Sequence, residues 1–281
     1  MKKSVSRQLA ATLVLAASAT MTASIAQEAP AQQAGQAQAN QAPAASPIPP
    51  KPYTMPTRGI PKHIQEAVQS PNRTPELKEM DGWNRPAEIL ALSGVRKGAR
   101  VIEFGPYDHY YTEMLLEAIG PKGELYIYEV PDIDEQVGER NREFAAKHPN
   151  VTYSGADYNT LEFPRQVDLV FNNLYFHEML LRGTQLEPLH SKLFKAMKPG
   201  AIYLAIDHTA VLGTETNHTG TLHRIDPSIM RAHIGAGGFE MVEDSRLLEN
   251  HSDDRTWPAF EPGKRVQTDR TVYKFRKPIV Y

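Results

Sequence analysis

Residues 100–129 decide the fold, and they read RVIEFGPYDHYYTEMLLEAIGPKGELYIYE. Residues 100–104 are β-prone and are closed by Gly105 and Pro106, which indicates a strand followed by a tight loop. Residues 112–119 place apolar side chains at helical spacing, and residues 125–129 form a second β-prone run. The stretch therefore predicts a strand, a helix and a further strand.

The same alternation continues along the chain. Further helices are predicted at 85–92, 133–147, 186–197 and from Pro227, with Asp226 as N-cap rather than catalytic acid, and further strands at 151–153, 167–171 and 201–206. Two longer strands, 239–247 and 271–276, follow without a clear helix between them, so we expect them to pair antiparallel. The pattern predicts a Rossmann-like, doubly wound α/β fold with a seven-stranded, mostly parallel sheet and a C-terminal antiparallel pair.

The first 26 residues have the pattern of a secretory signal peptide. Lys2, Lys3 and Arg7 precede an apolar stretch at residues 9–23, and small residues end at Ala26. The apolar stretch is shorter than the roughly 20 residues that cross a bilayer, which favours cleavage over a membrane anchor. We therefore expect a periplasmic or secreted protein with no stable membrane span in the mature chain.

Composition separates a tether from a folded domain. Residues 27–57 are rich in Ala, Gln and Pro and predict a disordered tether, and residues 58–281 form the domain. The chain has no cysteine, so disulfides and thiol chemistry are absent. Loss of the three N-terminal basic residues takes the formal charge from −2 to −5, which argues against a nucleic-acid partner. We expect a small-molecule ligand, and no sequence feature fixes an oligomeric state.

Several phrases of the sequence resemble those of a group of predicted, exported bacterial methyltransferases. They are VIEFG at 101–105, YYTE at 110–113, GPKGELY at 120–126, DHT at 207–209, TLHRIDP at 221–227 and DDRT at 253–256. With the order of the elements, they make the region from Arg85 to Pro278 similar to a class I S-adenosylmethionine-dependent methyltransferase. The resemblance implies S-adenosylmethionine as cofactor and methyl transfer to a small acceptor.

The resemblance also implies a set of cofactor-binding residues. In such domains the loop after the first strand receives the methionine end of the cofactor, which maps onto Gly105, with Glu103 and Tyr107 beside it. An acid that ends the second strand accepts the ribose hydroxyls, and Glu129 matches it. A polar residue after the third strand contacts the adenine, and Asp157 matches it.

The loop after the first strand departs from the family pattern. Tyr107 and His109 stand where the pattern has glycines. Either the loop swings wide and leaves room, or cofactor binding is weakened, altered or lost through these two bulky side chains. Export also favours weakened, altered or lost cofactor binding, because the cofactor is made in the cytosol.

Histidines gather after the predicted strands. His109, His177, His208, His218 and His223 all fall on connections at the carboxyl edge of the sheet, where open α/β folds place their ligands. A single loop histidine is ordinarily a surface residue, but this convergence predicts a catalytic role for His177, Asp207, His208 and His223. No metal site is predicted, because the sequence has neither cysteine nor a short-spaced histidine pair.

Three functions remain open at this point. In the first, a methyltransferase-like enzyme uses one histidine to remove a proton from the nucleophilic atom of the acceptor. In the second, a ligand-binding or catalytic domain on the same scaffold no longer transfers methyl groups. In the third, the domain is a tethered interaction module without chemistry.

Overall fold

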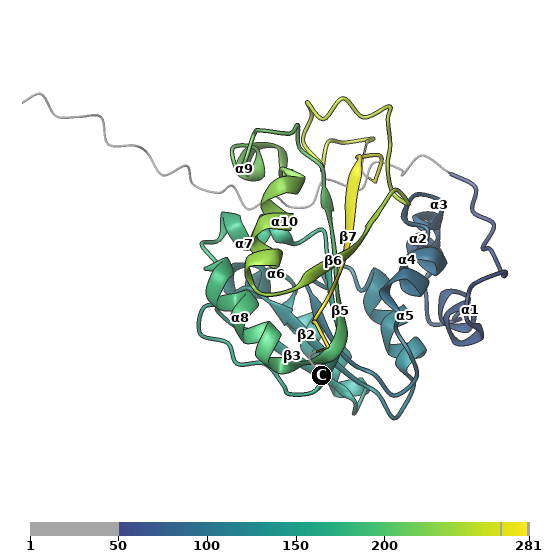
Figure 1. Cartoon of the computed structure of the whole chain (residues 1–281). Helices are drawn as coiled ribbons and strands as arrows, with labels where there is room; N and C mark the ends of the chain where they lie inside the picture. Colours follow the sequence, from purple (N-terminus) through teal and green to yellow (C-terminus); the bar gives the residue numbers. More distant parts are fainter. Residues whose placement is uncertain (1–50, 265, 280–281) are drawn as a thin grey trace, which may run out of the picture. The chain divides into compact units, whose positions relative to one another are not determined.

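A seven-stranded sheet with the order β3-β2-β1-β4-β5-β7-β6 forms the centre of the protein in a computed structural model that describes residues 51–264 and 266–279 (Figure 1). The first five strands are parallel, and β7 runs antiparallel to both β5 and β6. The strands are β1 (Arg100–Phe104), β2 (Glu124–Glu129), β3 (Val151–Gly155), β4 (Val167–Asn173), β5 (Met197–His208), β6 (Glu240–Ser245) and β7 (Arg270–Arg276). The predicted Rossmann-like fold, with its C-terminal antiparallel pair, is confirmed.

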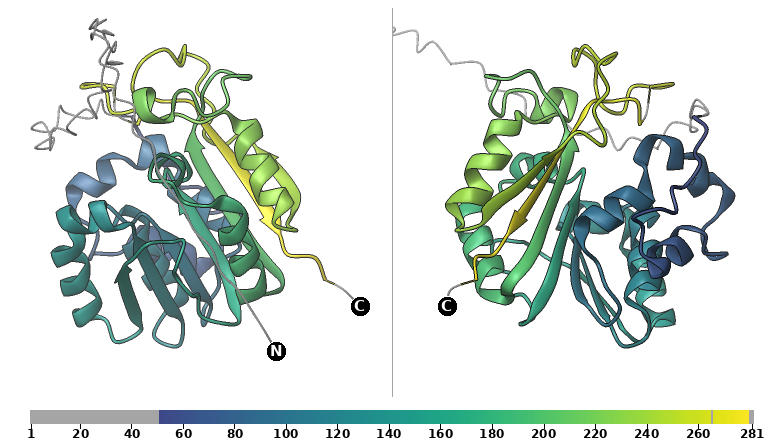
Figure 2. Two further views of the ribbon diagram at one scale, coloured as in Figure 1. Left: turned by 90° about the vertical axis from the view of Figure 1, so that its left-hand side faces the viewer. Right: turned by 45° about the vertical axis from the view of Figure 1, so that its right-hand side comes forward.

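Helices cover both faces of the sheet (Figure 2). One face carries α1, α4, α5 and Phe144 of α6 in one apolar cluster, and the other carries α7, α8 and α10 in a second cluster. The helices are α1 (Lys62–Val68), α2 (Pro75–Glu79), α3 (Asp81–Asn84), α4 (Pro86–Ser93), α5 (Tyr110–Ile119), α6 (Pro131–Lys147), α7 (Phe176–Leu181), α8 (Leu186–Ala196), α9 (Thr219–Leu222) and α10 (Pro227–Ala236).

The central strand β1 shows why the sheet is doubly covered. Successive side chains of a strand point to opposite faces, so Val101 joins the first cluster and Ile102 the second. Both residues are fully buried. Because β1 lies between β2 and β4 and all three are parallel, the residues that follow them meet at one edge of the sheet.

The largest differences from the prediction concern β5 and α7. The strand predicted at 201–206 is longer than expected, since β5 begins at Met197 and pairs with β4 from Val167 onward. Helix α7 was not predicted, because six residues are too few to show a helical period. The helix predicted after Asp226 is confirmed, since the Asp226 carboxylate accepts a hydrogen bond from the Ser228 amide at 2.9 Å.

The folded region begins before the predicted residue 58. Tyr53 donates a hydrogen bond to Glu88 Oε2 at 2.7 Å, and Met55 packs against the first apolar cluster. Residues 51–57 therefore belong to the domain rather than to the predicted tether of residues 27–57. The predicted signal peptide, residues 1–26, and the tether as far as residue 50 lie outside the described residues. In the part of the chain that the structure describes, the helices all lack the length and apolar character that a bilayer crossing requires.

Candidate functional site

A buried histidine–aspartate pair lies where β4 and β5 end. His177 is in the first turn of α7, directly after β4, and Asp207 is near the end of the neighbouring β5. Asp207 Oδ1 lies 2.7 Å from His177 Nδ1, and Asp207 Oδ2 accepts the His177 backbone N–H at 2.8 Å. Both side chains are fully buried. A carboxylate can only accept here, so Asp207 fixes the proton of His177 on Nδ1 and leaves Nε2 facing away from it.

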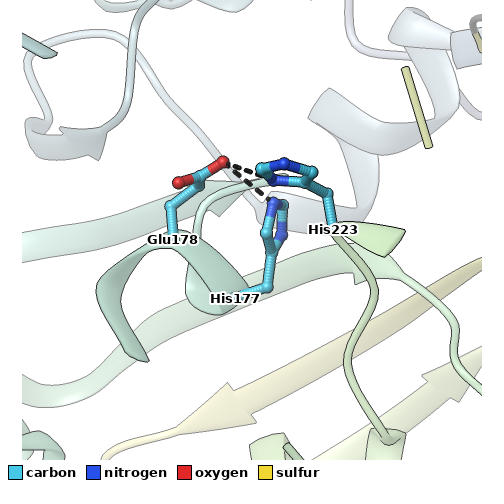
Figure 3. A group of neighbouring side chains, drawn as sticks. All are labelled: His177, Glu178 and His223. Atoms are coloured by element: carbon cyan, nitrogen blue, oxygen red, sulfur yellow. Dashed lines mark hydrogen bonds and ion pairs between the residues drawn. The ribbon is translucent and has the colours of Figure 1, made fainter. Parts of the chain in front are cut away.

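Glu178 connects this pair to a second histidine (Figure 3). Its Oε1 lies 3.2 Å from His177 Nε2 and 3.0 Å from His223 Nδ1. Its other carboxylate oxygen pairs with Arg182, whose Nε donates to Asp132 at 2.7 Å. We call His177, Glu178 and His223 the His–Glu–His cluster. The figure shows the two rings and the carboxylate turned toward one another.

His208 lies beside this cluster. Its ring centroid is 5.9 Å from that of His177, and its Nδ1 is 2.7 Å from Thr268 Oγ1. Burial, reinforced by the neighbouring His177, lowers the pKa of His208 well below its ordinary value. Burial also lowers the pKa of His223 to about 4, with His177 as the second cause. Both rings are therefore neutral near pH 7, which leaves each with one nitrogen lone pair.

A loop covers the cluster from the carboxyl end of the sheet. Figures 1 and 2 show α9 and the loop of residues 246–264 and 266–269 at the same end of the sheet. Phe260 of this loop places its ring 5.0 Å from that of His223 and 6.0 Å from that of His208. Arg224, the neighbour of His223, is fully buried and forms a two-point ion pair with Asp253 of the loop, at 2.8 and 3.1 Å.

A second group of residues lies where β1 and β2 end. Gly105 has φ 68°, and a Cβ added to it would run into the ring of Tyr175. Tyr175 Oη donates to Glu129 Oε2 at 2.6 Å, while Glu129 Oε1 has no hydrogen-bond partner among the described residues. We call Gly105, Glu129 and Tyr175 the crevice.

Burial sets the charge of the acids near the crevice. Glu129 is fully buried, which raises its pKa to about 7, although the hydrogen bond from Tyr175 acts in the opposite direction. Glu103, two residues before Gly105, is also buried, and its pKa rises to about 8. A carboxyl with a pKa near 7 carries a proton part of the time, so Glu129 can donate as well as accept a hydrogen bond.

Comparisons with known proteins agree with the geometry of the sheet. No family model matches the chain. The ubiquinone/menaquinone biosynthesis C-methyltransferase UbiE of Photorhabdus laumondii is 27% identical over 177 residues, which are 62% of this chain and 68% of that protein. The enzyme of the same name from Pasteurella multocida is 27% identical over 125 residues, and the chain spans only 45% of its length.

Solved structures show the same architecture. An S-adenosylmethionine-dependent methyltransferase from Mesorhizobium loti superposes with a TM-score of 0.50 at 14% identity, over 70% of this chain and 99% of that one. The [4+2]-cyclase SpnF superposes with a TM-score of 0.52 at 14% identity, over 84% of this chain and all of that one. The protein has the fold of the class I S-adenosylmethionine-dependent methyltransferases. At this identity the superposition shows the fold alone, and one of the two proteins is a cyclase.

The predicted obstruction lies elsewhere than in Tyr107 and His109. Tyr107 is 45% exposed, and its ring centroid lies 5.8 Å from the guanidinium of Arg140 on α6. His109 Nε2 lies 2.6 Å from Asn141 Oδ1, also on α6. Both side chains therefore lie toward α6, and the ring that stands against Gly105 is that of Tyr175. The prediction that Tyr107 and His109 obstruct this place is therefore wrong: the contact comes from Tyr175 at the N-cap of α7, in the connection that follows β4, the neighbour of β1.

The other predicted site residues divide into two groups. The structure brings His177, Asp207, His208 and His223 together as predicted, and their catalytic role stays a prediction. His109 does not join them, because it packs between α5 and α6 with its ring 4.6 Å from that of Phe144. Asp157 is exposed and accepts the Asn159 amide at 2.9 Å in a local turn, and its contact with adenine stays a prediction.

Sequence reasoning missed Glu178 and Tyr175. Both lie within two residues of His177, in the segment LYFHE at 174–178. A signal was present, because polar and aromatic residues directly after a central parallel strand fall at the ligand edge of the sheet.

The polar groups of the crevice suit the ribose of S-adenosylmethionine, but the Tyr175 ring occupies the place beside them. Glu129 offers a buried carboxylate with an oxygen that no described side chain bonds, and Gly105 offers backbone with no Cβ in the way. In this conformation Tyr175 fills the place next to both.

Proposed function

We propose that this protein is an S-adenosylmethionine-dependent methyltransferase that acts on a small acceptor held beside the His–Glu–His cluster. Support comes from the methyltransferase-like fold and from the distant similarity to two C-methyltransferases. The observation that carries the proposal is the buried carboxylate of Glu129 at the end of β2. Its Oε1 has no hydrogen-bond partner among the described residues, so it is available to a hydroxyl group of a ligand.

Each half of the edge would have its own task. Glu129 would hold the ribose hydroxyls, and Gly105 would let the cofactor approach the backbone. When bound, the cofactor supplies an electrophilic methyl group. The His–Glu–His cluster, held by Asp207 and Arg182, would position the acceptor and promote loss of its proton.

Tyr175 would act as a gate between the two halves. Its hydroxyl bonds Glu129, and its backbone is the N-cap of α7, the helix that carries His177. A bound ribose would replace the phenol hydroxyl as the donor to Glu129. The apparent affinity for the cofactor would then be the intrinsic affinity multiplied by the fraction of molecules in which the Tyr175 ring is turned away from Gly105.

Calorimetry with S-adenosylmethionine and its demethylated product tests this proposal. Tyr175→Ala removes the ring and a hydrogen bond to a carboxyl group, a bond worth about 1.5–3 kcal/mol, so we expect affinity to rise about ten- to hundredfold. Tyr175→Phe should give a smaller rise because the ring remains. Glu129→Ala should abolish the gain in a Tyr175→Ala background.

Tyr107→Ala is the matched control, since it removes an exposed tyrosine near the same loop without touching Gly105. It should leave the affinity unchanged within about twofold, the size of an ordinary surface effect. If neither the native protein nor a folded Tyr175→Ala variant binds the cofactor, the proposal fails.

That outcome would favour a second function. The Tyr175 ring would then stay against Gly105, and the domain would bind or convert a small molecule at the His–Glu–His cluster without methyl transfer. The observation that favours this alternative is the contact of the ring with both Gly105 and Glu129. The fold permits it, because the [4+2]-cyclase SpnF has the same architecture.

We also propose that the protein acts in the periplasm or outside the cell. Support comes only from residues 1–26, whose basic start, apolar stretch and small residues suit a signal peptidase. N-terminal sequencing of protein from the cell envelope should find Gln27 as the first residue, and a chain that still begins at Met1 would contradict export by this route.

A further inference from the structure

We infer that His177, Glu178 and His223 bind a divalent transition-metal ion such as Zn²⁺. One ligand atom from each residue, Nε2, Oε1 and Nδ1 respectively, lies within 4.8 Å of the other two. Ligands about 2.0–2.1 Å from a tetrahedral Zn²⁺ are roughly 3.3 Å from one another. Glu178 Oε1 lies 3.2 Å from one nitrogen and 3.0 Å from the other, so these separations already match.

The outer contacts hold the ligands in the orientation that a metal requires. Asp207 bonds His177 Nδ1 at 2.7 Å, which is the carboxylate–histidine arrangement that second-shell residues give to metal ligands. It directs the lone pair of Nε2 toward Glu178 and His223. Arg182 holds the other oxygen of Glu178, so Oε1 is the one that faces the histidines.

An orphaned nitrogen points to a missing cation. The His177 side chain is fully buried, and within the described residues its Nε2 has no hydrogen-bond partner, since the contact with Glu178 Oε1 is short but poorly aligned. A carboxylate oxygen and a ring nitrogen, both electron-pair donors, therefore meet at the centre of the cluster. Such a meeting is unfavourable unless a cation lies between them.

Charge and access also suit a dication. Glu178 and Asp207 supply two carboxylates, and Arg182, which pairs with Glu178, shares its charge with Asp132. The His223 side chain is 29% exposed, whereas that of Glu178 is 11% exposed, so the cluster opens on the His223 side. Three protein ligands and an open side are the arrangement of catalytic rather than structural zinc.

The open position would take an oxygen of the acceptor. A bound Zn²⁺ would lower the pKa of an acceptor hydroxyl ligated there, and the proton would pass to solvent on the open His223 side. This step alone rests on the proposed function. In this arrangement His177 is a metal ligand and is not the histidine that removes a proton from the acceptor.

The sequence predicted no metal because the ligands lie far apart in the chain. His177 and Glu178 are neighbours, but His223 is 45 residues from Glu178. The pairing depends on α7 and α9 lying at the same end of the sheet, which local spacing does not reveal.

Metal binding by the untagged chain tests the inference. After removal of metal with a chelator, we expect one equivalent of Zn²⁺ to bind in competition with a chromophoric chelator, and Co²⁺ to give the visible absorption of a four-coordinate site. His223→Ala and Glu178→Gln should each weaken binding by more than about tenfold, since even outer partners contribute 10–100-fold.

His218→Ala and His251→Ala are the matched controls. His218 lies at the N-cap of α9, and His251 is an exposed histidine of the covering loop. Both should bind Zn²⁺ as the native chain does, and thermal melting should show all four variants folded.

Two results would overturn the metal site. One is a native chain that takes up no Zn²⁺. The other is folded His223→Ala and Glu178→Gln variants that bind as tightly as the controls. Neither cofactor nor acceptor is present in these measurements, so the result is independent of whether the protein transfers methyl groups.

Discussion

The crevice and the His–Glu–His cluster lie at the same edge of one sheet but differ in how they are filled. In the crevice a single aromatic side chain, Tyr175, covers a glycine and a buried acid. In the cluster polar groups face one another, and the surrounding loop leaves His223 partly exposed. One region is thus filled by a single aromatic ring, and the other is lined by ion pairs and stays partly exposed at His223.

This contrast shows that a departure from a binding motif does not identify the side chain that obstructs the binding site. Tyr107 and His109 depart from the glycine pattern, yet they pack against α6. Tyr175 belongs to no such motif, yet it stands against Gly105. Three changes test the contrast between a closed crevice and a braced cluster.

The largest expected effect comes from the brace of the cluster. Asp253→Asn removes the charge that pairs with buried Arg224, and an uncompensated buried charge costs about 3–5 kcal/mol. Urea unfolding should show this loss in the free energy of unfolding. The control Asp254→Asn, an exposed neighbour that accepts hydrogen bonds from Thr256, should leave the free energy of unfolding nearly unchanged. Equal losses would show that the covering loop does not brace the cluster.

The second effect comes from the acid of the crevice. Burial raises the pKa of Glu129 from 4.5 to about 7, so its ionisation opposes folding. Its favourable contribution is complete below pH about 4.5 and is lost as the pH rises to about 7, a change of up to about 3 kcal/mol. Glu129→Gln stays neutral and should remove this slope.

Glu124→Gln is the control of opposite sign. Tyr126 and Arg100 lower the pKa of this mostly exposed carboxyl, so its contribution is lost as the pH falls. The free energy of unfolding of both variants, measured from pH 4 to 8, tests these two opposite pH dependences. A Glu129→Gln variant with the native pH profile would mean that Glu129 is solvated and the crevice is open.

The smallest effect tests the contact between ring and glycine. Gly105→Ala and Gly98→Ala both place an alanine at positive φ, which costs about 1–2 kcal/mol. Only Gly105 has Tyr175 against it, and overpacking adds about 1–3 kcal/mol there. The difference between the two variants should disappear in a Tyr175→Ala background. If it persists, something other than the ring restricts Gly105.

Sequence and structure agree most closely where a local pattern has a single physical reading. The strand at 100–104 is observed as predicted, because a short β-prone run ends at Gly105 and Pro106. The N-cap at Asp226 is likewise a local hydrogen bond. The gathering of His177, His208 and His223 was predictable as well, since carboxyl ends of parallel strands share one edge, whereas His109, predicted with them, packs on α6.

The seven-stranded α/β fold and the edge at which its polar residues meet therefore follow from the sequence. The contacts between individual side chains depend on the tertiary structure. Tyr175 lies over Gly105 because β4 is the neighbour of β1, His109 packs on α6 because α5 and α6 share a face, and His223 reaches Glu178 because α9 folds back to α7. Each contact joins residues far apart in the chain, and periodicity and local propensity describe only neighbours.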